Sequence, residues 1–131
     1  MIRARHIMCK RTAVRTNMAG RELVFKLMAT GCPGLPVVNG QMEVVGVITA
    51  FDILKAIRKG TGVDNITVES VMSQAPESAD ADTPLESLID KMIANNFTII
   101  PITHNKKLVG IVSRNEILEA YTDPHLFSAV A

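Results

Sequence analysis

One nine-residue segment occurs twice in this chain and constrains its fold more than any other feature. The first copy, G-V-I-T-A-F-D-I-L, spans residues 46–54, and the second copy, G-I-V-S-R-N-E-I-L, spans residues 110–118. Each copy predicts a short buried strand, then a hydroxyl residue, then an apolar helix with a carboxylate in its first turn. Because the copies lie about half the chain length apart, the sequence predicts one supersecondary unit built twice.

The elements around the two copies recur in the same order: strand, helix, strand, strand, helix. A short polar turn joins each pair of adjacent strands, which is typical of a hairpin. The predicted elements of the first half are a strand at 12–16, a helix ending at Gly31, strands at 35–38 and 44–49, and a helix at about 50–59. Those of the second half are a strand at 76–80, a helix ending at Asn96, strands at 100–102 and 108–113, and a helix at about 114–121.

The first helix of the second half has clear start signals. Thr83 is a candidate N-cap, Pro84 would occupy the first helical position, and Glu86 would complete a capping box with Thr83. Apolar residues at helical spacing then predict the face that each helix buries. These residues are Leu23, Val24, Leu27 and Met28 in the first half, and Leu85, Leu88, Ile89, Met92 and Ile93 in the second half.

We therefore predict an α/β (α+β) fold of two pseudo-symmetric motifs, each a small β-sheet covered by two helices, with the motifs packed sheet to sheet. The predicted boundaries are 1–60 for motif 1, 61–67 for a linker, 68–123 for motif 2 and 124–131 for a C-terminal tail. Because the two motifs are alike, a cleft formed by one is expected to be formed again by the other.

Composition narrows the class of protein. The formal net charge is +1, and aromatic residues make up only 4% of the 131 residues, without any Trp. Nucleic-acid binding is therefore disfavoured, because bulk positive charge and stacking rings are both lacking. The only cysteines, Cys9 and Cys32, lie in the same half, which predicts a reducing, cytoplasmic setting and no disulfide framework. No apolar run is long enough to span a membrane.

The hydroxyl and carboxylate of each copy suggest a binding site. Thr49 and Asp52 stand at the start of one helix, where the hydroxyl and free backbone N–H groups could bind a phosphate and the carboxylate could accept from ribose hydroxyls. Ser113 and Glu116 repeat this arrangement, and Arg114 adds a positive charge for phosphate. The same spacing is also that of an ordinary capping box, which is compatible with binding.

The chain resembles a pair of cystathionine β-synthase (CBS) domains in its order of elements, its L-P-V-V strand at 35–38 and its duplicated segment. The resemblance covers roughly residues 5–122. It implies a regulatory module that binds AMP, ADP, ATP or S-adenosylmethionine between its two motifs, catalyses no reaction, needs no cofactor, forms a homodimer and controls a partner protein. It does not indicate which of these ligands is bound or which partner is controlled.

The resemblance also implies where the adenine would lie. For the Thr49/Asp52 site, the implied contacts are Val47, Thr98 and Ile99; for the Ser113/Glu116 site, they are Thr12, Pro33, Gly34 and Ile111. Glu116 departs from the family pattern, which usually has Asp at this position. Its extra methylene group shifts the carboxylate, so we expect Thr49/Asp52 to be the better nucleoside site and Ser113/Arg114 the better phosphate site.

Other functions compete with ligand sensing. The chain could be a ligand-free dimerisation or interaction scaffold, which the Glu116 substitution favours. An enzyme is disfavoured because no nucleophile or acid–base pair can be assembled. His6 and Cys9 have metal-ligand chemistry at close spacing, but no second pair accompanies them, so no metal site is predicted.

Overall fold

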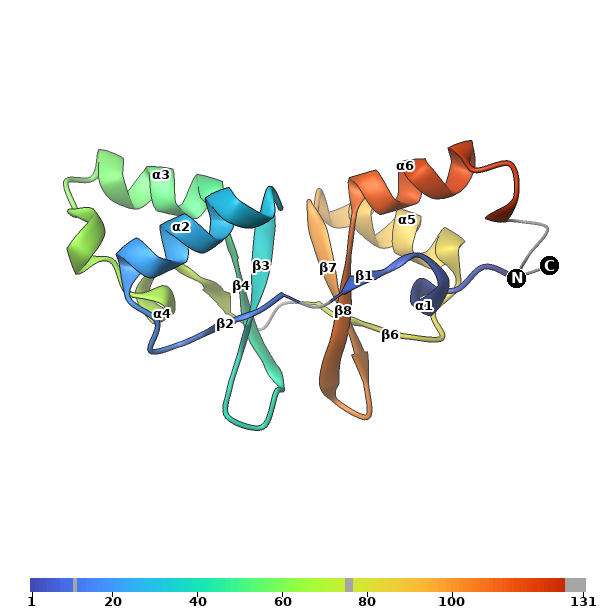
Figure 1. The fold of residues 1–131 in the computed structure, drawn as a ribbon, viewed down its shortest axis with the longest axis horizontal. Helices are drawn as coiled ribbons and strands as arrows, with labels where there is room; N and C mark the ends of the chain where they lie inside the picture. The colour runs from blue at the N-terminus through green and yellow to red at the C-terminus, as the bar shows by residue number, and fades with distance from the viewer. Residues whose placement is uncertain (11, 75–76, 127–131) are drawn as a thin grey trace. The chain divides into compact units, whose positions relative to one another are not determined.

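The computed structural model describes residues 1–10, 12–74 and 77–126. The chain divides into two compact units (Figure 1). Unit 1 consists of Met1–Arg11 and Glu77–Ala131, and unit 2 consists of Thr12–Pro76. The opening segment of the chain therefore packs with the second half, and the segment that opens the second half packs with the first. This division by packing differs from the contiguous motifs 1–60 and 68–123, which stay a prediction.

Unit 2 contains a four-stranded sheet of order β2-β3-β4-β5. Strand β2 runs parallel to β3, whereas β3 with β4 and β4 with β5 are antiparallel. Its elements in chain order are β2 (Val14–Arg15), α2 (Gly20–Thr30), β3 (Gly34–Val38), β4 (Val44–Thr49), α3 (Ala50–Arg58), the 3-10 helix η1 (Val63–Asn65), α4 (Val68–Val71) and β5 (Ser73–Gln74).

Unit 1 repeats this arrangement with a sheet of order β1-β8-β7-β6. Strand β6 is parallel to β7, and β8 is antiparallel to both β7 and β1. Its elements are α1 (Ala4–Ile7), β1 (Cys9–Lys10), β6 (Ala79–Asp80), α5 (Leu85–Asn95), β7 (Ile99–His104), β8 (Lys107–Ser113) and α6 (Arg114–Thr122). The mixed α/β fold predicted from the sequence, with small sheets and two long helices per unit, is confirmed.

Each unit has its own cluster of buried aliphatic side chains. In unit 2, Leu23 of α2 packs with Leu35 and Ile48 of the hairpin; in unit 1, Leu88 of α5 packs with Ile100 and other hairpin residues. The helix ends also follow the sequence. Gly31 and Asn96 both adopt the left-handed conformation as C-caps, with φ of 65° and 54°. Local chemistry therefore determines where α2 and α5 end.

The predicted start of α5 is wrong by one residue. Pro84, not Thr83, is the N-cap, and the helix begins at Leu85. The reason lies in the opening segment of the chain, which pairs with the residues before the helix. The Thr83 carbonyl accepts the Ala4 N–H at 2.8 Å, and Leu85 donates to the Ile2 carbonyl at 3.0 Å. This pairing extends the chain through Thr83, so the predicted capping box with Glu86 does not form.

Two residues assigned to buried helix faces are exposed instead. Met28 is 69% exposed and Ile93 is 76% exposed. They occupy related positions on α2 and α5, at the edge of an apolar stripe whose other members are buried or partly buried. Leu23 and Leu88, by contrast, are completely buried. The apolar stripes are thus wider than the sheets that cover them.

Segment 61–67, predicted as a linker, packs into unit 2. It contains η1, and Ile66 is 2% exposed. Gly20, at the start of α2, makes this packing possible. A Cβ at Gly20 would lie 2.3 Å from the Val63 carbonyl oxygen and 2.6 Å from that of Ile66. Only glycine therefore allows α2 to approach this segment so closely.

Glycine leads each copy of the repeated segment for a similar reason. A Cβ at Gly46 would lie 2.9 Å from the Ser73 carbonyl oxygen, and one at Gly110 would lie 2.8 Å from that of Cys9. These glycines let β4 and β8 accept the short edge strands β5 and β1. The glycine that leads each copy therefore lies where a segment distant in sequence adds an edge strand to the sheet.

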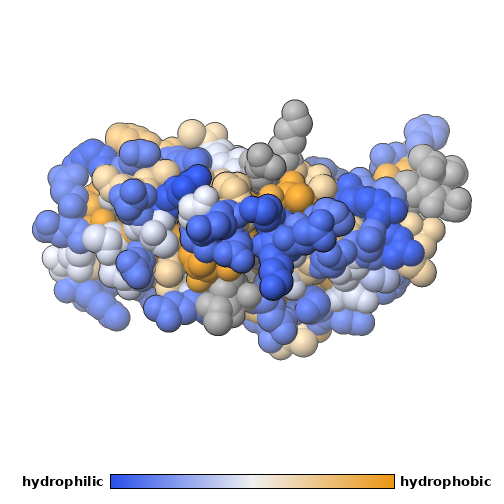
Figure 2. All heavy atoms as spheres, turned by 90° about the horizontal axis from the view of Figure 1, so that it is seen from below, coloured by the Kyte–Doolittle hydropathy of each residue, from blue (hydrophilic) through white to orange (hydrophobic). Residues whose placement is uncertain are grey.

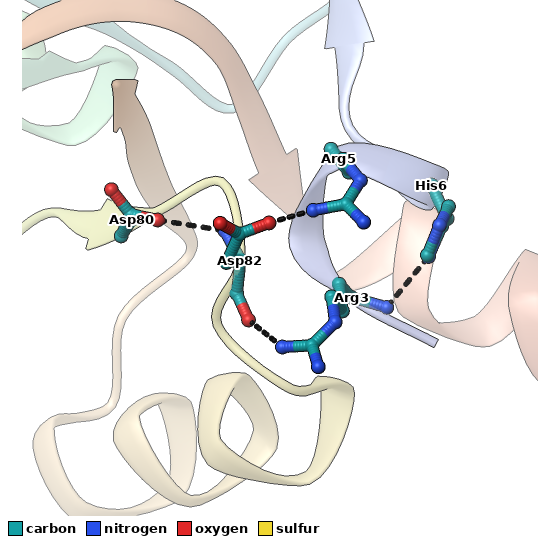
Figure 3. A network of polar contacts seen from close by, with 5 residues as sticks. All are labelled: Arg3, Arg5, His6, Asp80 and Asp82. Atoms are coloured by element: carbon teal, nitrogen blue, oxygen red, sulfur yellow. Dashed lines mark hydrogen bonds and ion pairs between the residues drawn. The ribbon is translucent and has the colours of Figure 1, made fainter. Parts of the chain in front are cut away.

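The opening segment is anchored to unit 1 by a polar network (Figure 3). Arg3 donates through Nη1 to the Asp82 carbonyl at 2.6 Å, and Arg5 forms an ion pair with the Asp82 carboxylate. Asp80 accepts the Asp82 N–H at 2.8 Å, which holds the turn. At the other end, His6 Nδ1 accepts the Arg3 N–H at 2.8 Å and closes the first turn of α1.

This geometry predicts a pH-dependent contribution to stability from His6. Desolvation by burial, followed by the charges of Arg5, the N-terminus and Arg3, lowers the pKa of His6 below its usual 6.5. The unfolded chain then binds the proton more tightly than the folded chain does, so stability falls as pH drops below about 6.5. His6→Asn keeps an acceptor that does not titrate. We expect its melting temperature to fall less than that of the wild type between pH 8 and pH 5.5; equal pH profiles would contradict this.

One face of the molecule is mainly hydrophilic. Figure 2 shows a face covered mainly by hydrophilic side chains, with apolar atoms between them. Among the described residues, no helix has the length and apolar character needed to cross a lipid bilayer. Cys9 and Cys32 form no disulfide in the part of the chain that the structure describes.

Candidate functional site

Thr49 and Asp52 form a reciprocal capping box at the junction of β4 and α3. Asp52 Oδ2 accepts both the N–H and the hydroxyl of Thr49 at 2.9 Å, and Thr49 Oγ1 accepts the Asp52 N–H at 3.2 Å. The local sequence causes this arrangement, because Thr49 ends the strand in an extended conformation and Asp52 lies one helical turn later. The box fixes the carboxylate at the end of the sheet.

The other oxygen of Asp52 has fewer partners. Its Oδ1 lies 3.7 Å from Lys55 Nζ, and the Asp52 side chain is 13% exposed. A carboxylate has about four lone-pair sites, so Asp52 can hold its cap and still accept from a ligand. Lys55 also lies over the Phe51 ring, 5.1 Å from its centroid. Lys55 was not among the residues predicted from the sequence, although its spacing from Asp52 on the helix would have indicated the ion pair.

Asp52 lines a polar hollow of about 350 Å³ in unit 2. Lys55 and Lys59 from α3 and Ser70 from α4 line the same hollow. Two ammonium groups outnumber the single carboxylate, so the hollow favours an anion.

The backbone N–H groups expected to bind phosphate are less available than predicted. Ala50 donates its N–H to the Pro33 carbonyl at 3.4 Å, and Asp52 donates its own to Thr49. Two N–H groups of the first turn of α3 therefore have acceptors already. The expectation of free N–H groups was wrong for these two, because the Ala50 N–H has an acceptor in the residue before β3 and the Asp52 N–H has its own N-cap as acceptor.

The hairpin brings further predicted residues next to Thr49. Gly34 is paired with Thr49 across β3 and β4, and Val47 lies two residues before Thr49 on the same face of β4. A Cβ at Gly34 would lie 3.0 Å from Thr49 Cγ2, so the glycine keeps the strands close here. Thr12 precedes β2 and is partly buried in this unit.

In unit 1, Ser113 and Glu116 form the corresponding capping box at the start of α6. Ser113 ends β8, is 7% exposed and donates its N–H to Glu116 Oε1 at 2.7 Å. Ile99 is paired with Ser113 across β7 and β8, just as Gly34 is paired with Thr49. Thr98 precedes β7, and Ile111 lies on β8 two residues before Ser113. The longer Glu side chain therefore still caps its helix.

Arg114 binds acceptors at the C-terminal end of α5, and its role as a phosphate ligand stays a prediction. Its Nε donates to the Phe97 carbonyl at 3.1 Å, and its Nη2 donates to Asn96 Oδ1 at 3.0 Å. The guanidinium group thus binds the acceptors at the C-terminal end of α5, where positive charge is favourable. These contacts could not be predicted from the sequence, because they depend on α5 ending beside the start of α6.

The surroundings of the two capping boxes differ in charge. Glu116 lines a hollow of about 180 Å³ together with Glu119, Asp123 and His6. The hollow beside Asp52 is lined instead by Lys55 and Lys59. Among the described residues, no group of three or more His, Cys, Asp or Glu side chains is arranged to hold a metal ion.

The structure thus gathers the predicted residues into one set per unit. Unit 2 holds Thr12, Pro33, Gly34, Val47, Thr49 and Asp52, and unit 1 holds Thr98, Ile99, Ile111, Ser113, Arg114 and Glu116. The grouping of Thr98 and Ile99 with Asp52, and of Thr12, Pro33 and Gly34 with Glu116, stays a prediction.

Comparison with known proteins identifies the family. Residues 4–59 and 68–123 each match the CBS domain, so the chain belongs to the CBS domain family and carries two such domains in tandem. CBS domain pairs are regulatory modules rather than catalytic ones.

Curated relatives are longer than this chain. An uncharacterised protein MK0525 from Methanopyrus kandleri is 27% identical over 83% of this chain, which spans 56% of that protein's length. A homoserine O-acetyltransferase from Methanosalsum zhilinae is 36% identical over 79% of this chain, which spans only 20% of the enzyme. The similarity to that enzyme therefore covers a small part of it.

Solved structures share the fold. The CBS domain pair of protein MJ0100, in complex with 5′-methylthioadenosine and S-adenosylmethionine, is 25% identical with a TM-score of 0.84, over 93% of this chain and 97% of that one. CBSX2 in complex with AMP is 20% identical with a TM-score of 0.80, over 93% of this chain and 97% of that one, which shows the fold alone.

Proposed function

We propose that this CBS domain pair is a ligand-sensing regulatory module that binds an adenosine-containing ligand and thereby changes the activity of a partner protein. The observation that carries this proposal is the Asp52 carboxylate, which is fixed by Thr49 through Oδ2 and keeps acceptor capacity at Oδ1. A carboxylate held in this way is suited to accept hydrogen bonds from both hydroxyls of a ribose. The adenosine ligands of the MJ0100 pair support the same ligand class.

The charges beside Asp52 favour a phosphate-bearing ligand. Lys55 and Lys59 line the hollow next to the carboxylate. A phosphate would gain from these ammonium groups, whereas the positively charged sulfonium of S-adenosylmethionine would not. We therefore propose that AMP, ADP or ATP binds this unit more tightly than S-adenosylmethionine does.

Regulation requires that the ligand distinguish two states of the protein. A ligand shifts an equilibrium only by the difference between its affinities for the two states. We propose that ligand binding at Asp52 changes how the module pairs with itself or with its partner. A cytoplasmic location, inferred from the two cysteines, belongs to the same proposal.

A homodimer is supported by exposed apolar side chains on α2, α3, α5 and α6. Phe25, Met28, Phe51 and Leu54 of unit 2 are each more than half exposed, as are Ile93, Leu118 and Tyr121 of unit 1. Exposed apolar side chains gathered in this way are typical of protein interaction surfaces. A second copy of this chain would cover them, and the same surfaces would also serve the alternative function, a dimerisation scaffold without ligand.

Removing two of these apolar side chains should abolish pairing. In Phe25→Ser/Leu54→Ser, we expect a monomer at concentrations where the wild type is dimeric, because a dimer then loses about 2 kcal/mol for each buried large apolar side chain. Sedimentation velocity measures this, and Ala29→Ser, also exposed on α2, is a control that removes no large apolar side chain. A double variant that remains dimeric would contradict the proposed interface.

Thermal stabilisation tests the ligand proposal at low cost. A ligand that binds only the folded protein raises the melting temperature with its concentration and affinity. We expect AMP, ADP or ATP to raise the melting temperature more than S-adenosylmethionine does. No shift with any adenosine compound at millimolar concentration would favour the scaffold over the sensor.

A further inference from the structure

The hollow beside Asp52 has a counterpart in unit 1. The unit 2 hollow lies between α3 and α4, and the unit 1 hollow lies between α6 and α1. Six residues that line one hollow correspond to six that line the other, each pair being 64 positions apart in the sequence. These pairs are Asp52 with Glu116, Lys55 with Glu119, Ala56 with Ala120, Lys59 with Asp123, Ser70 with His6 and Val71 with Ile7. The fold therefore forms the same hollow twice.

The two hollows differ in charge. Two ammonium groups and one carboxylate line the unit 2 hollow, whereas three carboxylates and the His6 imidazole line the unit 1 hollow. Desolvation by burial, followed by neighbouring positive charges, lowers the pKa of His6, so this imidazole is largely neutral near pH 7 and does not offset the carboxylates. An anion is therefore attracted to the unit 2 hollow and repelled by the unit 1 hollow.

The two lysines of the unit 2 hollow lie at different distances from Asp52 along α3. Lys55 follows Asp52 by three residues and Lys59 follows it by seven. At about 1.5 Å of rise per helical residue, the two lysines are roughly 6 Å apart along the helix axis. A phosphate on a ribose bound at Asp52 would lie nearest to Lys55, and only further phosphates in a chain would extend toward Lys59. The arrangement therefore suits several linked phosphates better than one.

Other features of the unit 2 hollow also suit a phosphate chain. Within the described part of the chain, Lys59 takes part in no ion pair, so no neighbouring carboxylate neutralises it. Thr61 lines the same hollow, and its hydroxyl can donate to a phosphate oxygen. The volume of about 350 Å³ is near the lower end for small-molecule sites, so the hollow would hold part of a nucleotide rather than all of it.

We propose that the unit 2 hollow binds the phosphate chain of an adenosine polyphosphate, ADP or ATP, and that the unit 1 hollow excludes this chain. Lys55 and Lys59 then determine a preference for ATP over AMP, while Glu119 and Asp123 prevent a second ATP from binding equally well. This inference rests on the proposed function and adds which unit binds the phosphates and which residues select their number. It ranks unit 2 above unit 1 for phosphate, which is the reverse of the sequence-based prediction.

Calorimetric titration with AMP and ATP, in the absence of divalent cations, tests this assignment. We expect one high-affinity ATP site per chain, with a dissociation constant about tenfold below that of AMP, because each exposed ion pair contributes modestly. Lys59→Gln should weaken ATP binding and leave AMP binding unchanged, and Lys55→Gln/Lys59→Gln should remove most of the difference between the two nucleotides. Added salt should weaken ATP binding more than AMP binding.

Two further variants complete the experiment. Lys106→Gln/Lys107→Gln removes two positive charges at the exposed turn between β7 and β8 and should leave both affinities unchanged. Glu119→Lys/Asp123→Lys gives the unit 1 hollow the two lysines of unit 2 and should raise the ATP stoichiometry from one toward two. Circular dichroism verifies that every variant is folded.

The possible results separate this inference from the proposed function. ATP that binds no more tightly than AMP, or that loses no affinity in Lys59→Gln, would overturn the phosphate assignment and leave the adenosine sensor intact. Two ATP molecules of equal affinity per wild-type chain, or an unchanged stoichiometry in Glu119→Lys/Asp123→Lys, would overturn the exclusion by unit 1. A folded wild type that binds neither nucleotide would overturn the proposed function itself.

Discussion

Replacing Asp52 by alanine should weaken adenosine-ligand binding roughly a hundredfold, because two charge-assisted hydrogen bonds of about 1.5 kcal/mol each would be lost from the ribose. The same substitution removes half of a capping box that the structure shows intact. Folding stability should therefore fall by about 1 kcal/mol. Calorimetric titration of the folded variant with AMP measures the first effect, and urea unfolding measures the second.

Two matched variants separate binding from capping. Thr67→Ala removes a cap of α4, where the Thr67 hydroxyl accepts the Ser70 N–H, without touching Asp52. It should lower stability and weaken affinity far less than Asp52→Ala does. Glu116→Ala removes the related carboxylate of unit 1 and should weaken binding less than Asp52→Ala does. Unchanged affinity in folded Asp52→Ala would mean that the carboxylate is a helix cap and nothing more.

Gly20→Ala should destabilise the fold by about 2–3 kcal/mol, the cost typical of overpacking. The added Cβ would lie 2.3 Å from the Val63 carbonyl oxygen, so α2 and the segment after α3 must move apart. The direction of the change in folding stability is informative, because replacing a helical glycine by alanine ordinarily stabilises a protein by roughly 0.5–1 kcal/mol. Urea unfolding measures the change.

Gly40→Ala is the control for this substitution. Its added Cβ would meet nothing within 4 Å, so we expect a change within about 0.5 kcal/mol. If Gly20→Ala were as stable as the wild type, the close packing of α2 on residues 63–66 would be incorrect.

Much of the fold could be predicted because its determinants are local. The two copies of the repeat place β4 with α3 and β8 with α6, and Gly31 and Asn96 end their helices through their own backbone preference. The start of α5 could not be placed correctly, since Thr83 is held extended by Ala4, a residue distant in sequence. No local pattern carries that information.

Apolar periodicity has a related limit. It predicts which face of a helix is apolar but not how much of that face the sheet covers. Met28 and Ile93 follow the helical spacing of buried residues, yet both are exposed. The same stripe can pack against the chain's own core or against another molecule, and only the tertiary structure separates the two.

The part of the candidate site that depends on local contacts could be predicted from the sequence. Thr49 and Asp52 form the expected local box, because both partners lie within one helical turn. The Ala50 N–H, by contrast, donates to Pro33, just before β3, and the Arg114 guanidinium group donates to residues just after α5. The partners of these two donors depend on tertiary packing, which the sequence pattern does not specify.

The proposed function depends above all on the binding of an adenosine-containing ligand by this chain. Isothermal titration calorimetry of the folded wild type with AMP, ADP, ATP and S-adenosylmethionine tests it most directly. We predict saturable binding of at least one nucleotide, with an affinity that Asp52→Ala reduces strongly. The absence of saturable binding by all four compounds would contradict the sensor function and leave the dimerisation scaffold as the better account.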